Sequence, residues 1–267
     1  MPILHIALVA LIQGITEFLP ISSSGHLILL PNLTGLPDQG QAIDVAVHVG
    51  TLGAVVVYFR QDVQRALKGL PKVARRQIDD QNAWLALCLI IATIPVVLIG
   101  LVMQLSGIEQ SLRSLEVVGW TTLIFGLVLW WADRTGTHDR EFEGWSLKHA
   151  WYVGLWQAIA LIPGTSRSGI TITGARFLGY KRHDAARIAM LMSIPAIAAS
   201  GIFLMIEVAS QANAAAARDG ALAAAMAFLA AIGALHFMMR LLRTVSFTPY
   251  VIYRVILGIA LLAIAYG

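Results

Sequence analysis

The chain has 267 residues, of which 58% are hydrophobic and only 13% are charged. A soluble domain carries about 25% charged residues, so this composition excludes an ordinary soluble globule, a disordered chain and a nucleic-acid-binding protein of the usual basic kind. The apolar residues come in long blocks and the mean hydropathy is +0.74, which indicates that the bilayer is the solvent. The single cysteine, Cys88, excludes an intrachain disulfide and a cysteine metal site.

Two apolar stretches, 3–36 and 150–175, are interrupted by proline, glycine and polar residues. Each is followed by three uninterrupted blocks of about 16 to 23 residues, near the length that crosses a hydrocarbon core. In chain order these blocks are 43–59, 83–105 and 117–132 after the first stretch, and 188–206, 220–239 and 249–266 after the second. The pattern therefore predicts an all-α integral membrane protein with six transmembrane helices and two broken segments.

Loop charge predicts the orientation of these blocks. Segment 60–82 carries six basic residues against three acids, and segment 176–187 carries four against one, so both are expected in the cytoplasm. Segments 106–116 and 207–219 each carry two acids and one base, which suits the outside. Each broken segment then starts and finishes on one side, so we interpret both as re-entrant helix–loop–helix hairpins. The alternative is two proline-kinked spans and eight crossings, which fits the loop charges less well.

The two halves of the chain are predicted to form an inverted repeat within one membrane domain, 1–267. Repeat 1 covers about 1–132 and repeat 2 about 150–267. The break from Gln13 to Gly25 aligns with the break from Gln157 to Gly169, with small gaps around each proline. Paired broken hairpins of opposite insertion place a binding site at the repeat interface, near the middle of the membrane.

The first break holds a carboxylate, three hydroxyls and an imidazole within ten residues. Glu17 lies in an apolar stretch, where a carboxylate is costly and needs a partner or a function, and Gln13 shares its helix face. Ser22-Ser23-Ser24-Gly25-His26 completes an inventory of nucleophile and base. At least one of the serines is expected to cap the next helix.

The second break supplies glycines, hydroxyls and one guanidinium, in the run Pro163-Gly164-Thr165-Ser166-Arg167-Ser168-Gly169-Ile170-Thr171. Backbone N–H groups at a helix N-terminus bind anions, and glycines let a phosphate approach closely. Arg167 adds a bidentate donor suited to phosphate oxygens. His48 and His236 lie within predicted spans and are interpreted as packing residues, and Asp44 is expected at the mouth of the cavity.

The pattern Gln13-x-x-x-Glu17 followed by Ser22-Ser23-Ser24-Gly25-His26 closely resembles the first signature of the bacterial undecaprenyl pyrophosphate phosphatases, or bacitracin-resistance protein family. The run from Pro163 to Thr171 resembles their second signature, Pro-Gly-x-Ser-Arg-Ser-x-x-Thr. The resemblance implies a phosphatase of the bacterial cytoplasmic membrane that removes the terminal phosphate of a C55 isoprenyl pyrophosphate carrier. It also implies an inverted-repeat fold, a site open to the periplasm and a homodimer. The first position of this signature is Glu or Gln in the family. Because this chain has Gln13 there, Glu17 is the only carboxylate in the motif.

The expected mechanism places the pyrophosphate between the two breaks, where Arg167 and nearby backbone N–H groups neutralise its oxygens. By its place in the family motif Ser23 is the preferred nucleophile and Ser166 the second, while direct attack by water stays open. His26 and Glu17 are expected to share the acid–base work. The other expected substrate-binding residues are Gln13, Ser22, Ser24, Gly164, Ser168, Gly169 and Thr171.

Glu17 is also the expected ligand of a divalent cation, Mg²⁺ or Ca²⁺, because both prefer oxygen ligands. No organic cofactor is expected. The expected partners are a polyprenyl pyrophosphate lipid, the membrane and a second copy of the chain, with no nucleic acid. The rival hypothesis is a lipid or anion transporter of inverted-repeat type. Such a carrier would use Arg167 as an anion clamp but would not need a cluster of serine, histidine and glutamate.

Overall fold

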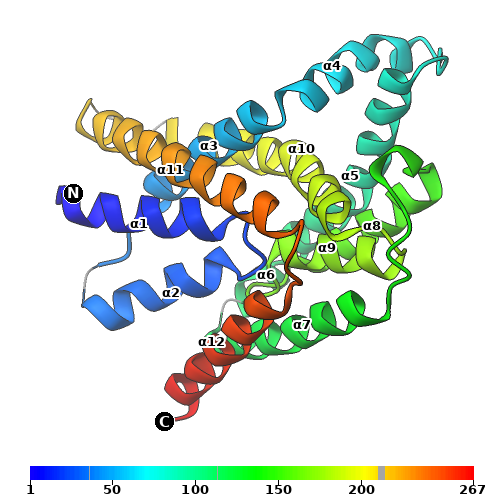
Figure 1. The fold of residues 1–267 in the computed structure, drawn as a ribbon. Coiled ribbons are helices and arrows are strands. Elements are labelled where there is room, and N and C mark those ends of the chain that lie inside the picture. Colours follow the sequence, from blue (N-terminus) through cyan, green and yellow to red (C-terminus); the bar gives the residue numbers. More distant parts are fainter. Residues whose placement is uncertain (36, 113, 210–213) are drawn as a thin grey trace.

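The computed structural model describes residues 1–35, 37–112, 114–209 and 214–267, without the side chains at 32–33, 109–110, 200, 202–209 and 214–215. The described chain is almost entirely helical, with one isolated bridge between Arg140 and Tyr180. Its helices are α1 (Ile3–Thr16), α2 (Ser23–Thr34), α3 (Gln41–Tyr58), α4 (Arg60–Ala74), α5 (Gln81–Ser106), α6 (Ile108–Ser111), α7 (Leu115–Thr135), the 3₁₀ turn η1 (Phe142–Gly144), α8 (Leu147–Ile159), α9 (Arg167–Phe177), α10 (Arg182–Ala209), α11 (Ala214–Leu241) and α12 (Thr248–Tyr266). Figure 1 shows their arrangement.

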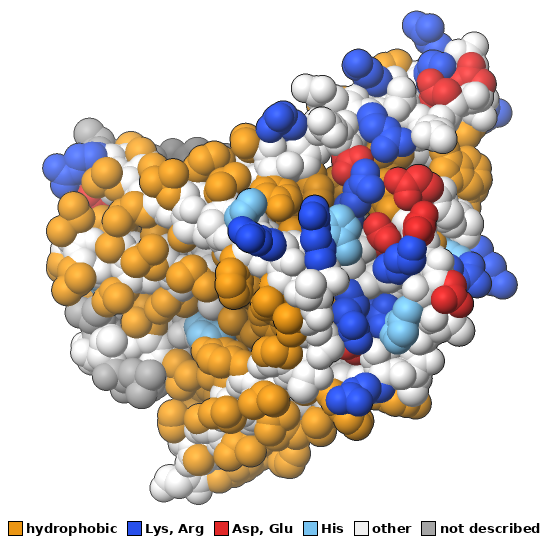
Figure 2. Space-filling view, viewed as in Figure 1, with side chains coloured by type: hydrophobic (Ala, Val, Ile, Leu, Met, Phe, Trp, Pro, Cys, Tyr) orange, Lys and Arg blue, Asp and Glu red, His pale blue; other side chains and the backbone are white. Residues whose placement is uncertain are grey.

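Among the described residues, the helices long and apolar enough to cross a membrane are α3, α5, α7, α11 and α12. They coincide with five of the six predicted spans, which confirms a multi-pass, all-α membrane protein. The sixth predicted block, 188–206, lies within α10, and most side chains of its last residues are outside the described part of the chain. Large apolar side chains stay on the surface, as Leu229 at 70% exposure illustrates, and Figure 2 shows the broad hydrophobic surface that they form. Lipid covers such a surface at no hydrophobic cost.

Each interrupted stretch folds as two short helices with a non-helical break. Stretch 3–36 holds α1 and α2, and stretch 150–175 holds most of α8 and most of α9. These helices have 14, 12, 13 and 11 residues, in that order. At a rise of about 1.5 Å per residue each is shorter than the roughly 30 Å hydrocarbon core, so none of them crosses it alone.

The segment 60–82, expected as a loop, begins with helix α4. Asp62 lies in its first turn and Lys72 in its last, which favours a helix through the macrodipole. Its basic side chains alternate with apolar ones such as Leu67 and Leu70, which are exposed. A helix that carries both kinds of side chain is typical of a membrane surface. A count of charges alone registers only the basic residues and therefore does not reveal the helix.

Close backbone packing joins α1, α3 and α11, which lie together in Figure 1. A Cβ atom added at Gly14 of α1 would lie 2.6 Å from the carbonyl oxygen of Ala227, and one at Gly50 of α3 would overlap the backbone of Ala224. Small residues on both sides of an interface let membrane helices approach closely, so the alanine-rich sequence of α11 sets this packing.

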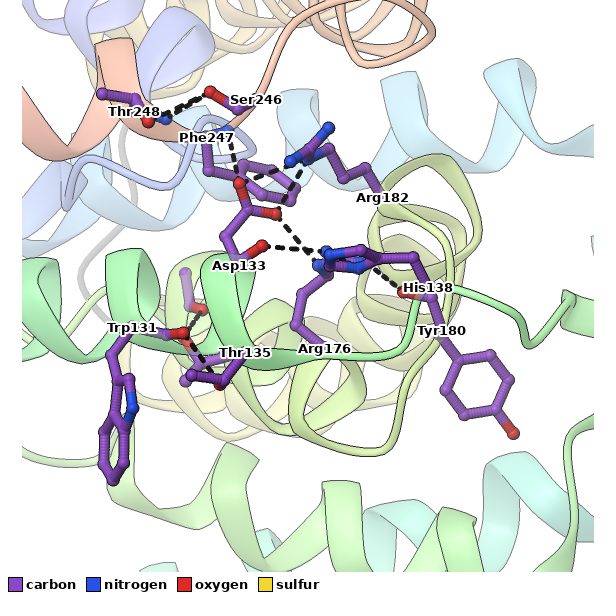
Figure 3. A network of polar contacts seen from close by, with 12 residues as sticks. Trp131, Asp133, Thr135, His138, Arg176, Tyr180, Arg182, Ser246, Phe247 and Thr248 are labelled. Atoms are coloured by element: carbon purple, nitrogen blue, oxygen red, sulfur yellow. Dashed lines mark hydrogen bonds and ion pairs between the residues drawn. The ribbon is translucent and has the colours of Figure 1, made fainter.

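A buried ion network ties together the ends of four helices (Figure 3). Asp133 at the end of α7 accepts from Arg176 Nε of α9 at 3.0 Å and from Arg182 Nε of α10 at 2.9 Å. The backbone N–H of Phe247, just before α12, donates to the same carboxylate at 3.2 Å. Arg176 also contacts His138 and donates to the carbonyl oxygen of Tyr180. Because Asp133 and Arg176 are almost fully buried, each needs the other.

Candidate active site

Both breaks end in the same serine turn. Ser22 and Ser166 have φ angles of 72° and 68°, in the left-handed region that is uncommon for serine. Each is the N-cap of the following helix, and its Oγ accepts from the backbone N–H of Gly25 at 3.4 Å or of Gly169 at 3.2 Å. The hydroxyls two residues apart are also paired, at 3.1 Å in the first break and 3.2 Å in the second. The two turns therefore direct the N-termini of α2 and α9 in equivalent ways.

The two breaks are hydrogen-bonded to each other. Ser24 Oγ accepts from the backbone N–H of Gly164 at 3.3 Å, and Ser168 Oγ donates to the carbonyl oxygen of Leu19 at 3.0 Å. Each break thus uses the serine of its own helix N-terminus to satisfy a backbone group of the other break. Such groups at membrane depth would be costly without a partner, so these two bonds hold the breaks together.

Glu17 is the point where side chains from both breaks meet. Its Oε2 accepts from Gln13 Nε2 at 2.7 Å and from Ser23 Oγ at 3.0 Å. Its Oε1 accepts from the guanidinium of Arg167 in the second break. The Glu17 side chain is only 6% exposed, so this ring of donors balances a carboxylate that is nearly buried.

A cavity of about 730 Å³ opens in front of this cluster. The sequence-predicted residues that line it are Glu17, Ser22, Ser23, Ser24, Gly164, Ser166 and Arg167. Its remaining wall is mostly apolar and comes from α3, α5, α8, the second break and α10. A cavity with convergent polar groups at one end and an apolar wall suits a ligand that has a charged head and a hydrocarbon chain.

Four predicted binding residues lie behind the cavity wall. Gln13 is fully buried and reaches only Glu17. The backbone N–H of Gly169 donates to Ser166 Oγ, and Thr171 Oγ1 donates to the carbonyl oxygen of Arg167 at 2.7 Å. Together with Ser168, these residues shape the breaks, and they do not line the cavity.

His26 does not line the cavity either, although the sequence predicted it as a catalytic residue. Its Nδ1 lies 2.6 Å from the carbonyl oxygen of Ser22, so that nitrogen carries the proton. Its Nε2 lies 2.6 Å from the hydroxyl of Tyr253, and the two rings are stacked with centroids 5.5 Å apart. Both ring nitrogens therefore already have a hydrogen-bond partner.

His48, and not His26, is the histidine that lines the cavity. It comes from α3, and its Nε2 lies 4.0 Å from Oε2 of Glu17. Its Nδ1 lies 2.7 Å from the carbonyl oxygen of Asp44, which makes Nδ1 the donor and leaves Nε2 basic and directed at the carboxylate. The signal in the sequence was the polar series Gln41, Asp44 and His48 on one face of an apolar span.

The chain matches the family described as bacitracin resistance protein BacA over residues 6–260, which include both breaks. The chain belongs to the BacA family. Similar BacA-family sequences are called undecaprenyl-diphosphatase in Ruegeria pomeroyi, at 65% identity, and in Roseobacter denitrificans, at 62%, each over 100% of both chains. The relative of that name in Teredinibacter turnerae is 46% identical over 98% of both chains. The family resemblance carried by the two signatures is therefore confirmed.

Two further residues of this BacA chain lie at the site although the sequence motifs assign them no role. Arg254 of α12 is fully buried and donates to the carbonyl oxygens of Thr122, Gly164 and Thr165, at 3.0, 3.3 and 2.9 Å. It holds the second break against α7. Gln157 of α8 lines the cavity, is fully buried, and has no hydrogen-bond partner for its amide among the described residues. The alignment of Gln157 with Gln13 was the available signal for the amide, whereas the carbonyl contacts of Arg254 lie about 90 to 130 residues away and leave no local signature.

Proposed function

We propose that this chain is an integral membrane phosphatase that hydrolyses undecaprenyl diphosphate to undecaprenyl phosphate and inorganic phosphate. The observation that carries the proposal is the convergence of Ser23 and Arg167, one from each break, on the single carboxylate Glu17 inside a cavity with an apolar wall. Membership of the BacA family and relatives named undecaprenyl-diphosphatase support it. An anion carrier would need the guanidinium but would have no use for a hydroxyl bonded to a carboxylate.

The diphosphate group binds between the two breaks. Helices α2 and α9 both begin there. The first N–H groups of a helix have no partner within the helix and can bind an anion. Arg167 neutralises the negative charge that shifts among the diphosphate oxygens while the phosphoryl group is transferred. The buried and unpaired amide of Gln157 donates to one of these oxygens, which explains a polar group that would otherwise be costly.

Ser23 is the nucleophile of the proposed reaction. Its hydroxyl donates to Glu17, so the carboxylate accepts the proton as the Ser23 oxygen bonds to the terminal phosphorus. The bridging P–O bond breaks, and the lipid leaves as its monophosphate. Water then attacks the phosphoserine, Glu17 returns its proton to the departing Ser23 oxygen, and inorganic phosphate leaves with the two protons of the water. Ser166 is less suited because its hydroxyl already accepts from Gly169 as a helix cap.

His48 supports Glu17 in the acid–base steps. Its Nε2 faces the cavity and lies within 4.0 Å of the carboxylate, close enough to exchange a proton with it through a small rearrangement or one water. His48 thus takes the acid–base role that was expected of His26.

A divalent cation fits this site only together with the substrate. Within the described part of the chain there is no cluster of three or more His, Cys, Asp or Glu side chains, and Glu17 is the one carboxylate that lines the cavity. Mg²⁺ commonly binds through one or two carboxylates and the phosphates of a substrate. Glu17 would then be the protein ligand, and the ion would neutralise charge on the diphosphate.

We also infer that the fold is an inverted repeat whose broken segments are re-entrant hairpins. The matching turns at Ser22 and Ser166 support it, as do the reciprocal bonds between the breaks. The packing of α1 on α11 and of α8 on α5 is the arrangement that such a repeat produces. Loop charge supports a site that faces the periplasm from the bacterial cytoplasmic membrane. The homodimer stays a prediction of the family resemblance.

The test is phosphate release from undecaprenyl diphosphate by the purified, full-length chain in detergent, beside Ser23→Ala and Ser166→Ala. We expect release by the wild type, a loss of at least about 100-fold in Ser23→Ala, and a smaller loss in Ser166→Ala. Equal release by the wild type and Ser23→Ala would show that water attacks directly. No release by the folded wild type, with or without Mg²⁺ or Ca²⁺, would favour the transporter hypothesis.

A further inference from the structure

A second polar cavity, of about 710 Å³, lies at the other end of α3 from the candidate active site. Its wall includes Tyr58 of α3, Arg187 of α10 and Arg240 of α11. Along α3, Tyr58 is ten residues beyond His48, which corresponds to roughly 15 Å of helix. The two cavities are therefore separate, and no residue lines both.

The second cavity has a large excess of positive charge. Its titratable lining residues are Arg60, Asp62, His183, Arg187, His236, Arg240 and Arg243, together with Tyr58. Asp62, its one carboxylate, is already bound by Arg187 at 2.6 and 2.8 Å and lies 3.4 Å from Arg65. Among the described residues, no carboxylate lies within ion-pair distance of the other three arginines that line the cavity.

The nearby acids outside the wall do not change this balance. Asp184 lies 3.8 Å from the ring of His183, and Glu143 lies 3.5 Å from Arg187. Both contact groups other than the three unpaired arginines. Guanidinium groups from α4, α11 and the turn after α11 thus face one space without a counter-charge inside the described chain.

The cationic cavity adjoins a more apolar one, and four residues line both. An adjoining cavity of about 640 Å³ shares Tyr58, Arg60, His236 and Arg240 and adds Val57, Ile232, Gly233 and Phe237. Phe237 is 61% exposed and lies on the lipid-facing surface of a membrane-spanning helix. Figure 2 shows basic and histidine side chains gathered directly beside the hydrophobic surface. A ligand that fills both cavities has an anionic head and an apolar chain.

We propose that this pair of cavities binds the phosphate monoester headgroup of a membrane lipid. A terminal phosphate presents three oxygens and up to two charges, which several arginines from different helices can share through bidentate bonds. Basic pockets between transmembrane helices bind anionic lipid headgroups in this way. The lipid monophosphate released by the proposed reaction belongs to the same chemical class, but the inference depends only on the geometry of these cavities.

The test measures binding of fluorescent phosphatidic acid to the full-length chain in a neutral detergent, with phosphatidylglycerol and inorganic phosphate as competitors. The cavity variant is Arg240→Gln with Arg243→Gln. The matched control is Lys68→Gln with Arg75→Gln, which removes two exposed positive charges of α4 and its C-cap outside the cavity. None of these four residues belongs to the proposed catalytic machinery, so phosphate release should be unchanged, and a single symmetric peak in size-exclusion chromatography reports independently that each variant is folded.

We expect phosphatidic acid to bind at least fivefold more tightly than phosphatidylglycerol. Its affinity should fall at least tenfold in the cavity variant and less than threefold in the control. Equal losses in the two variants would show a general surface charge and overturn the proposal. Equal affinity for the two lipids, or displacement by inorganic phosphate at the same concentration as the lipid, would also overturn it. Failure of the proposed phosphatase function would leave these binding results untouched.

Discussion

Glu17 illustrates how one nearly buried carboxylate depends on residues that are far apart in the chain. Gln13 and Ser23 are its neighbours in sequence, but Arg167 lies 150 residues away and His48 belongs to another helix. The local partners could be predicted from helical spacing and from the serine motif. The distant ones depend on how the two breaks and α3 are packed, which spacing does not encode.

Replacing His48 by Gln should lower kcat for phosphate release by at least about tenfold, because general acid–base groups contribute about 10²–10⁴-fold. Replacing His26 by Gln should change kcat less than threefold, because both of its ring nitrogens are occupied outside the cavity. Steady-state kinetics of the two variants make the comparison. A larger loss in His26→Gln than in His48→Gln would restore the sequence-based assignment.

The candidate site could be predicted from the sequence as far as its motifs reach. Glu17, Ser23, Ser166 and Arg167 do line one cavity. His26 does not, because the carbonyl oxygen of Ser22 and the stacked ring of Tyr253, 227 residues away, hold its imidazole. A serine-to-histidine spacing cannot reveal a stacking partner on α12.

At the scale of single elements, the second break depends on a backbone shape that only glycine adopts easily. Gly164 has a φ of +85°, and a Cβ atom there would lie 2.5 Å from the carbonyl oxygen of Val118 and 2.8 Å from its Cα. Its own carbonyl oxygen accepts from Thr122 of α7 and Arg254 of α12. Contacts from two elements, α7 and α12, therefore fix this one position.

Gly164→Ala should destabilise the fold by about 2–4 kcal/mol, from a left-handed backbone and overpacking against α7. It should also lower phosphate release, because Arg167 follows in the same break. Gly25→Ala is the matched control, since its Cβ would meet nothing closer than 3.7 Å. Unfolding in mixed micelles, titrated with a denaturing detergent, measures the stability of the two variants. Equal stability of the two variants would contradict this account of the break.

Asp133→Asn should destabilise the fold by about 3–5 kcal/mol, because it leaves the buried guanidinium of Arg176 without its counter-charge. Glu141→Gln removes an exposed ion pair with Lys181 and should cost at most about 1 kcal/mol. The same unfolding titration compares them. If the Asp133 variant were as stable as the Glu141 variant, the network in Figure 3 would not hold the helix ends together.

The helices themselves were largely predictable, and for a physical reason. Bilayer thickness fixes the length of an apolar span, so blocks of hydropathy found α5, α7 and α12 to within a few residues. The same rule does not find α4, because its basic residues lower the mean hydropathy of an amphipathic helix and the segment was predicted as a loop. Proline and glycine located both breaks, but only the structure shows that serine turns of the same shape close them.

At the scale of the whole molecule, the proposed topology places the site and the basic cavity at opposite faces of the membrane. The loop before α3 is then periplasmic, and the turn between α4 and α5 is cytoplasmic. The single native cysteine, Cys88, is buried, so a Cys88→Ser background gives a silent reference for labelling.

In that background, Pro37→Cys should react with a membrane-impermeant maleimide in intact cells, because the residue is exposed in the loop before α3. Arg76→Cys, exposed in the turn after α4, should react only after the cells are permeabilised. The increase in the apparent mass of the labelled protein on a gel reports the reaction of each variant. The opposite pattern would invert the topology and place the candidate site at the cytoplasmic face.

The most direct measurement is a double-mutant cycle across the two breaks, with Glu17→Gln, Arg167→Gln and the combined variant assayed for phosphate release from undecaprenyl diphosphate. Each single change should cost at least about 100-fold, because each removes a group that acts on the reacting phosphate. The double variant should be little slower than either single one, because residues that act as a unit lose activity only once. Losses that multiply, or release that survives either change in folded protein, would contradict a site shared by the two breaks.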